Sequence, residues 1–180
     1  FISYRVWCDS VFAEQLFREL SRIELRPNEK LTVYLDKVRL LDGKRFDEGF
    51  SQGLANSQII GPIVSAKCLS DMLDLVNEDK EDFVRVEWIM AIELFERQRI
   101  LSIFPIILGE QQEDGQYTRD FFESLRSGDV VLNGKKQPLP DITSHKSNAK
   151  AREYLRLVDE DLSKERSIRE VVEELLKFQA

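Results

Sequence analysis

The residue best placed to do chemistry is Glu87, a carboxylate in the middle of the stretch 81–98. Apolar residues in this stretch recur at spacings of three and four, which predicts a helix with a broad buried face. Glu87 falls within that face. Its neighbours one helical turn away on either side are all apolar: Phe83, Val84, Met90 and Ala91. A carboxylate with no local cation is either a surface residue at the edge of the apolar stripe or a site residue, and the pattern leaves both open.

A second group of candidates is basic. The segment 36–45 reads DKVRLLDGKR, with a predicted turn at Asp42 and Gly43. It carries four basic residues: Lys37, Arg39, Lys44 and Arg45. Two interpretations stay open for it, a solvated surface loop or a basic binding segment.

Other catalytic residue types are scarce. His145 is the single histidine, so we expect neither a histidine-activated nucleophile nor a histidine-rich metal site. Cys8 and Cys68 lie far apart and have no partners at metal-ligand spacing. We expect both to be reduced thiols of a cytoplasmic protein, buried by packing.

Segments typical of strands and helices alternate up to residue 108. The expected strands are 1–4, 31–35, 57–64 and 100–108, with a bulge or an edge at Pro105. The expected helices are one capped by Asp9 or Ser10 that continues to Pro27, then 46–56 and 81–98. Between 65 and 79 we expect a transition with a short helical piece. Strict alternation predicts an α/β fold, an open parallel sheet with helices on both faces.

In such a sheet, ligands bind at the carboxyl ends of the strands. Here these ends are 5–8, 36–45 and the region after Val64. Arg5 and the basic segment 36–45 therefore fall on one rim of the sheet. Gly49 and Gly53 share one face of their expected helix, which would let another backbone or a ligand come close.

Length and composition predict a single domain. The chain has 180 residues, 42% of them hydrophobic and 33% charged. The net charge of -7 argues against an extended nucleic-acid surface, and no apolar run is long enough to be a membrane segment. Because the sequence begins inside an expected strand, we expect it to be a segment of a longer protein.

The pattern loosens after residue 110. We divide the domain into a core of about 1–110, a loop-rich extension over 111–150 and C-terminal helices over 151–180. Within the extension we expect a helix over 117–125, a short strand over 129–132 and a loop over 133–149. The stretch 163–178 predicts an amphipathic helix.

Four motifs in order resemble a Toll/interleukin-1 receptor (TIR) domain. FISYR is similar to the first-strand motif of that family, and YLDKVRLLDGKRF to its second strand and the following BB loop. SQIIGPIVS is similar to the third strand. DFVRVEWIMAIEL resembles the motif of the helix called C, an aromatic residue four positions before a glutamate. The resemblance covers about 1–108.

The resemblance implies a flavodoxin-like parallel sheet and two classes of function. Some TIR domains are signalling adaptors that self-associate through the BB loop. Others cleave NAD+ at the bond between nicotinamide and ribose, and these enzymes need the helix C glutamate. Glu87 falls on that position. The expected partners are therefore NAD+ as substrate, with no separate cofactor, and further TIR domains in a homo-oligomer.

Under the enzyme hypothesis, Glu87 would stabilise the oxocarbenium character that develops on the ribose. Phe83, Tyr4 and Trp7 are candidates to stack on a base of NAD+. The candidates to attract the pyrophosphate are Arg5, Lys37, Arg39, Lys44 and Arg45.

Asp36, at the end of the second expected strand, completes the set of candidates for substrate contact. A phosphoacceptor domain of similar topology would need several acids at strand ends, and only Asp36 is so placed. The residues do not choose between water attack, which gives ADP-ribose, and internal attack, which gives a cyclic product.

Overall fold

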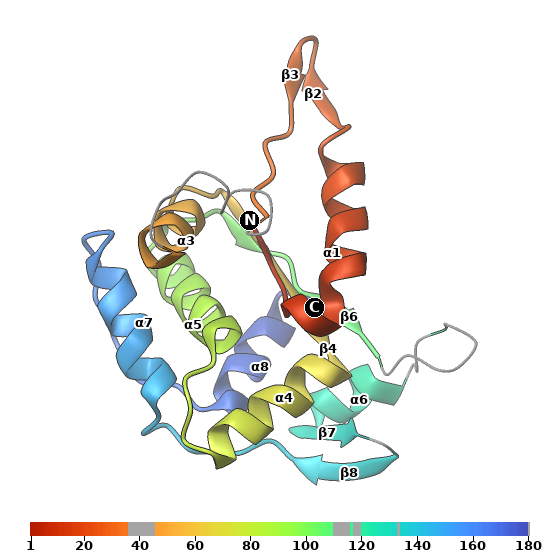
Figure 1. Cartoon of the computed structure of the whole chain (residues 1–180), viewed down its shortest axis with the longest axis vertical. Coiled ribbons are helices and arrows are strands. Elements are labelled where there is room, and N and C mark those ends of the chain that lie inside the picture. Colours follow the sequence, from red (N-terminus) through yellow and green to blue (C-terminus); the bar gives the residue numbers. More distant parts are fainter. Residues whose placement is uncertain (36–45, 110–115, 117–119, 133, 180) are drawn as a thin grey trace.

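The computed structural model describes residues 1–35, 46–109, 116, 120–132 and 134–179 (Figure 1). The N-terminal part contains β1 (Ile2–Ser3), α1 (Val6–Leu20), β2 (Glu24–Arg26), β3 (Glu29–Lys30) and α3 (Phe46–Ala55). The middle contains β4 (Ile59–Ser65), α4 (Ala66–Asn77), α5 (Phe83–Glu96), β5 (Ser102–Ile103) and β6 (Ile106–Leu108). The C-terminal part contains α6 (Asp120–Arg126), β7 (Asp129–Leu132), β8 (Lys135–Pro138), α7 (Lys146–Arg156) and α8 (Ile168–Lys177).

A parallel sheet is built around β4, whose apolar run was the clearest strand in the sequence. β1 pairs with β4 on one side, with Ile2 opposite Gly61. β5 and β6 both pair with β4 on the other side. They divide the single strand expected over 100–108, and the break falls at Phe104 and Pro105 because proline has no N–H for the ladder. The prediction of an α/β fold with a parallel sheet is confirmed.

The expected strand 31–35 does not form a regular ladder, although it lies beside β1. The Ile2 N–H donates to the Tyr34 carbonyl at 3.0 Å, and the rings of Phe1 and Tyr34 stack at 4.9 Å between centroids. The segment therefore lies where the second strand was expected, but it does not form the regular hydrogen-bond ladder of a strand.

The first helix is shorter than expected. It begins at Val6, with Arg5 and neither Asp9 nor Ser10 at the N-cap, and it ends at Leu20. The chain then forms the antiparallel β2–β3 hairpin, which projects from the body (Figure 1). Asn28 has a φ of 66° at its tip, so the left-handed turn after Pro27 reverses the chain.

Helices cover both faces of the sheet, but unequally. Along β4, Ile60 and Val64 enter a large apolar cluster with α3, α4, α5 and α8, whereas Ile63 enters a smaller cluster with α1. The alternation follows from the two-residue period of a strand. One face is therefore covered by α1, and the other by several helices (Figure 1).

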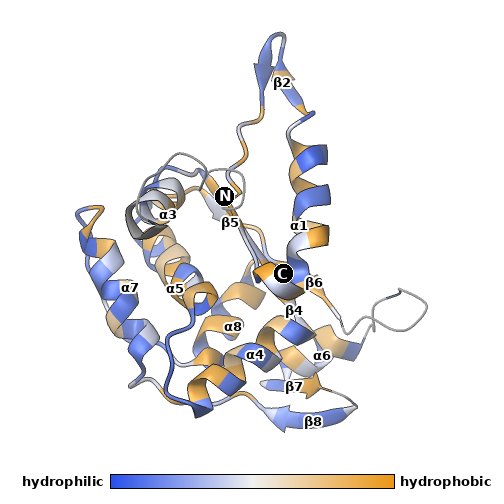
Figure 2. Ribbon diagram, viewed as in Figure 1, coloured by the Kyte–Doolittle hydropathy of each residue, from blue (hydrophilic) through white to orange (hydrophobic). Residues whose placement is uncertain are grey.

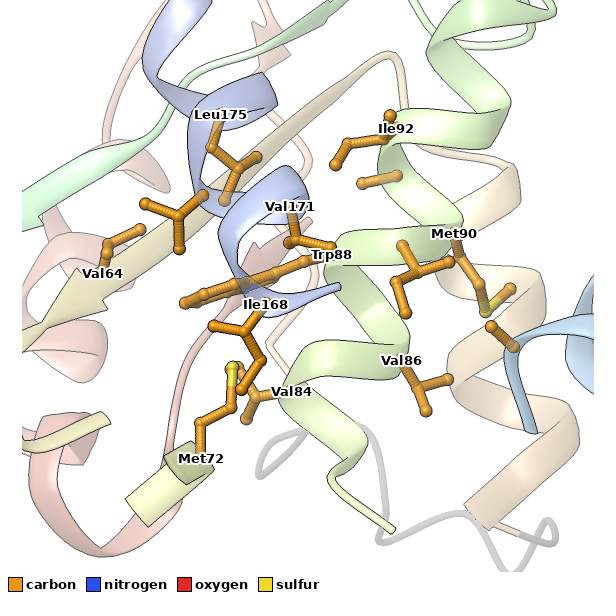
Figure 3. Packing of buried hydrophobic residues seen from close by; sticks show 14 of the residues in the cluster. Val64, Met72, Val84, Val86, Trp88, Met90, Ile92, Ile168, Val171 and Leu175 are labelled. Carbon is orange, nitrogen blue, oxygen red and sulfur yellow. The ribbon is translucent and has the colours of Figure 1, made fainter. Parts of the chain in front are cut away.

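The central helix is α5, which is buried from Val84 to Leu94. Its apolar character extends over most of its length (Figure 2). Figure 3 shows the Trp88 indole lying among Val64, Met72 and Ile168. The burial of α5 is completed by α7 and α8, which both pack against it. The C-terminal helices therefore belong to the core that holds Glu87.

Three segments differ from expectation in the rest of the chain. The region after β4 is a full helix, α4, whose first turn is capped by the Ser65 side chain. The expected loop over 133–149 contains β8, which pairs with β7, and the first turn of α7. The expected helix over 163–178 begins only at Ile168, where Ser167 and Glu170 form a capping box. None of the helices within the described ranges is long and apolar enough to cross a membrane.

Candidate active site

Glu87 lies in the second turn of α5 and faces the end of β1. The Ser3 hydroxyl, on the last residue of β1, donates to Glu87 Oε2. The Trp88 indole Nε1 donates to the same Ser3 oxygen at 3.1 Å. Glu87 is 5% exposed. The carboxylate is therefore held by a residue of the sheet, and Ser3 is a site residue that the sequence did not single out.

The alternation of side chains along β1 decides which candidates reach Glu87. Ser3 and Arg5 point to the α5 side, where they contact Glu87 and Asp82. Tyr4 points to the opposite face and packs in the cluster of α1 with Ala13. In this conformation the structure does not bring Tyr4 to Glu87.

Arg5 is engaged inside the protein. It is 4% exposed and forms an ion pair with Asp82, the N-cap residue of α5. The other Asp82 oxygen accepts from the Arg85 backbone N–H at 3.1 Å, and the Asp82 N–H donates to Ser147 Oγ at 3.0 Å. Asp82 therefore neutralises the guanidinium that the sequence assigned to a pyrophosphate.

The two other aromatic candidates lie at the surface of the same rim. Trp7 is 74% exposed, and its Nε1 donates to Asp71 at 2.8 Å. Phe83 is 39% exposed and begins α5, one turn before Glu87. Both rings are accessible to a planar ligand, unlike Tyr4.

The acidic and basic candidates of the predicted BB-like loop fall outside the described residues: Asp36, Lys37, Arg39, Lys44 and Arg45. The last described residue before them, Leu35, is buried in the same cluster as Tyr4.

These positions define what the site can do. A buried carboxylate, oriented by a hydroxyl and placed where β1 ends, can stabilise a cationic centre that is brought against it. The groups that the structure places in this arrangement, the Ser3 hydroxyl and the Trp88 indole N–H, are weak acids. The chemistry that suits it is the departure of a leaving group that needs no proton.

Comparison with known proteins found no match to any family model, curated protein or solved structure. The α/β assignment therefore rests on the fold itself, and the TIR likeness rests on the four sequence motifs.

The cysteines lie near the carboxyl end of β4. Cys8 is half-buried and Cys68 is buried, and both are free thiols. Burial raises the pKa of Cys8 to about 12 and raises the pKa of Cys68 as well. Both groups are therefore neutral thiols at neutral pH. The burial expected for both is found for Cys68, whereas Cys8 is only half-buried.

His145 is a capping residue. It is the N-cap of α7, and its Nδ1 accepts from the Ser147 N–H at 3.2 Å. Burial, followed by the charge of Arg85, lowers the pKa of His145. Within the part of the chain that the structure describes, no group of three or more His, Cys, Asp or Glu side chains could hold a metal ion.

Proposed function

We propose that this chain is a TIR-type enzyme that cleaves the nicotinamide-ribose bond of NAD+, with Glu87 as its catalytic residue. One observation carries the proposal: the Glu87 carboxylate is buried at the end of β1 and is oriented by the Ser3 hydroxyl. A buried charged group is costly, so a fixed carboxylate at a sheet rim favours a functional role over chance. The motif resemblance supplies the substrate.

In the proposed reaction, the bond between C1′ of the ribose and N1 of nicotinamide breaks. The bonding electrons move to the cationic nitrogen, so nicotinamide leaves neutral and needs no proton. The Glu87 carboxylate stabilises the positive charge that develops at C1′. The oxygen of a water molecule then bonds to C1′ and its proton is released to solvent, which gives ADP-ribose; attack by a nucleophile within the substrate would give a cyclic product.

Ser3 is a positioning residue in this proposal. Its hydroxyl donates to Glu87 while its oxygen accepts from Trp88, so the carboxylate is held in one orientation. Glu87 is only 5% exposed, so substrate reaches it when neighbouring groups move aside. Phe83 and Trp7 are the accessible rings that would stack on a base.

A second candidate function is a signalling adaptor that self-associates without catalysis. Exposed apolar side chains at the start of α1 favour it: Val6 is 55% exposed, Trp7 74% and Val11 72%. Under this hypothesis Glu87 is dispensable for signalling and the protein does not consume NAD+.

The decisive experiment incubates the purified protein with NAD+ and identifies the products by mass spectrometry. Glu87→Gln keeps the size of the side chain and removes its charge, so we expect it to abolish turnover. Glu123→Gln, at an exposed position of α6, is the matched control and should keep full turnover. Undiminished turnover in Glu87→Gln would overturn the assignment.

Self-association is tested by the same assay. If the BB-like loop of one copy completes the site of the next, turnover per molecule rises with protein concentration or on tethering. A flat dependence would indicate a site that one copy completes alone.

A further inference from the structure

A second polar cluster lies on the far side of α5 from Glu87, around Arg85. The two residues are two positions apart on the helix, so their side chains point in nearly opposite directions. Arg85 is 0% exposed. This cluster is independent of the proposed catalytic site and of the proposed function.

Three arginines are buried in the part of the chain that the structure describes, and they differ in how their charge is neutralised. Arg5 pairs with Asp82, and Arg166 pairs with Glu93 at 3.0 Å and with Glu96 at 2.6 Å. Arg85 has no ion pair among the described residues. Its Nη2 donates to the carbonyls of Arg166 at 2.8 Å and Ile142 at 3.4 Å. Those carbonyls supply partial charge only, and Asp82, whose charge acts on Arg85, is already paired with Arg5.

Several buried donors in this cluster have no acceptor. Arg85 Nε and Nη1 are buried without a hydrogen-bond partner, as is His145 Nε2. Because His145 Nδ1 accepts from the Ser147 N–H, the neutral ring carries its proton on Nε2, which is therefore a donor. Arg85 Nη2 and Asn148 Nδ2 donate to the same Arg166 carbonyl, and Asn148 lies in the first turn of α7, which His145 caps, so Arg85 lies close to the start of that helix.

The surroundings favour an anion. Ile142, whose carbonyl accepts from Arg85, lies three residues before His145, the N-cap of α7, an 11-residue helix whose first N–H groups carry partial positive charge. Burial lowers the pKa of Arg85 only to about 10, so the guanidinium stays charged at neutral pH. A buried charge without a counter-ion is strongly unfavourable, and every orphan atom named above donates rather than accepts.

We propose that Arg85, together with His145 Nε2, binds a small monovalent inorganic anion of the chloride class. The site is enclosed: Arg85 is 0% exposed, Asn148 0% and His145 8%. A small, singly charged ion costs the least to desolvate and balances the one uncompensated guanidinium. A divalent oxyanion would bring more negative charge than the one guanidinium balances.

The test is thermal unfolding of the whole chain in sodium chloride against sodium gluconate at equal ionic strength. We expect chloride to raise Tm along a saturable curve, as a ligand of the folded state does. Arg85→Met keeps the aliphatic stem and should lose this response. Arg18→Met removes an exposed arginine and should keep it.

Direct binding is followed by the line broadening of chloride NMR, which does not depend on any variant folding. The broadening should saturate with added protein and be reversed by bromide. His145→Asn keeps a capping acceptor but loses the Nε2 donor, so its affinity should fall several-fold. Equal Tm in chloride and gluconate, or broadening that bromide does not reverse, would mean that only water meets these donors and would overturn the proposal.

Discussion

Ser3 and Glu87 are 84 positions apart in the sequence, yet the Ser3 hydroxyl donates a buried hydrogen bond to the Glu87 carboxylate. Trp88 donates to the same hydroxyl oxygen at 3.1 Å, so Ser3 joins two neighbouring residues of α5 to the end of β1.

Ser3→Ala should lower kcat for NAD+ cleavage more than it changes KM. A hydrogen bond to a charged group contributes about 1.5–3 kcal/mol, so we expect roughly a 10- to 100-fold loss. Steady-state kinetics measure both constants. Ser124→Ala, which removes another buried hydroxyl from α6, should leave kcat unchanged. An unchanged kcat in Ser3→Ala would show that Glu87 does not depend on this contact.

Asp82→Asn should destabilise the fold by leaving Arg5 buried and unpaired. The asparagine keeps an oxygen to cap α5, so the variant isolates the loss of charge. The side chains of Arg5 and Asp82 are 5% and 0% exposed, and breaking a buried pair costs about 3–5 kcal/mol.

Urea denaturation of the two single variants, Arg5→Met and Asp82→Asn, and of their double variant measures the coupling. We expect the double variant to lose less than the sum of the single losses. Simple additivity would mean that the two side chains do not stabilise each other.

Stability should fall as the pH drops below about 6.5 because of His145. Burial and the charge of Arg85 lower the pKa of His145 from its ordinary value of 6.5, although Asp79 and Asp82 act in the opposite direction. The unfolded chain then binds a proton that the folded chain does not. The contribution of neutral His145 to the free energy of unfolding is complete above pH 6.5 and is lost as the pH falls through the pKa of His145 in the folded state.

His145→Asn should show a smaller loss of stability over the same pH range. Urea denaturation of the wild type and of His145→Asn at about pH 7.5 and about pH 5.5 measures how much free energy of unfolding each protein loses between the two pH values. Equal losses in wild type and variant would assign the pH dependence to other groups.

Gly53→Ala should destabilise the protein, whereas Gly49→Ala should not. A Cβ at Gly53 would lie 2.6–2.9 Å from three ring atoms of Tyr34, but a Cβ at Gly49 meets nothing within 4 Å. Overpacking costs about 1–3 kcal/mol, while alanine at an open helical position gains up to about 1 kcal/mol. Thermal unfolding compares the two. A stable Gly53→Ala would show that the Tyr34 ring moves aside at little cost.

The close approach expected at these glycines occurs at Gly53, but the group that approaches is a side chain of the same protein and not the backbone or ligand that we expected. The Tyr34 ring lies against it, and the Tyr34 hydroxyl donates to the Gly49 carbonyl at 3.2 Å. Spacing placed the two glycines on one face, but the partner comes from a distant part of the chain.

Local patterns predicted several elements well. β4 was predicted from a nearly continuous apolar run, and α5 from apolar residues spaced three and four apart. The break at Pro105 was predicted because proline has no N–H to donate to a strand ladder. Predictions were poorer where local signals compete. The apolar spacing that seemed to carry the first helix to Pro27 ends at Leu20, and the turn at Asn28 forms a hairpin instead.

The sequence by itself determined the alternation of strands and helices, the placement of Glu87 on a buried helix face and the absence of a cation one turn away. These are properties of residues within one helical turn or one strand. Only the tertiary structure decided that Ser3 orients Glu87, that Asp82 occupies Arg5 and that Tyr4 lies on the other face. Those outcomes depend on how β1 is set against α5, a relation between distant segments that no local period encodes.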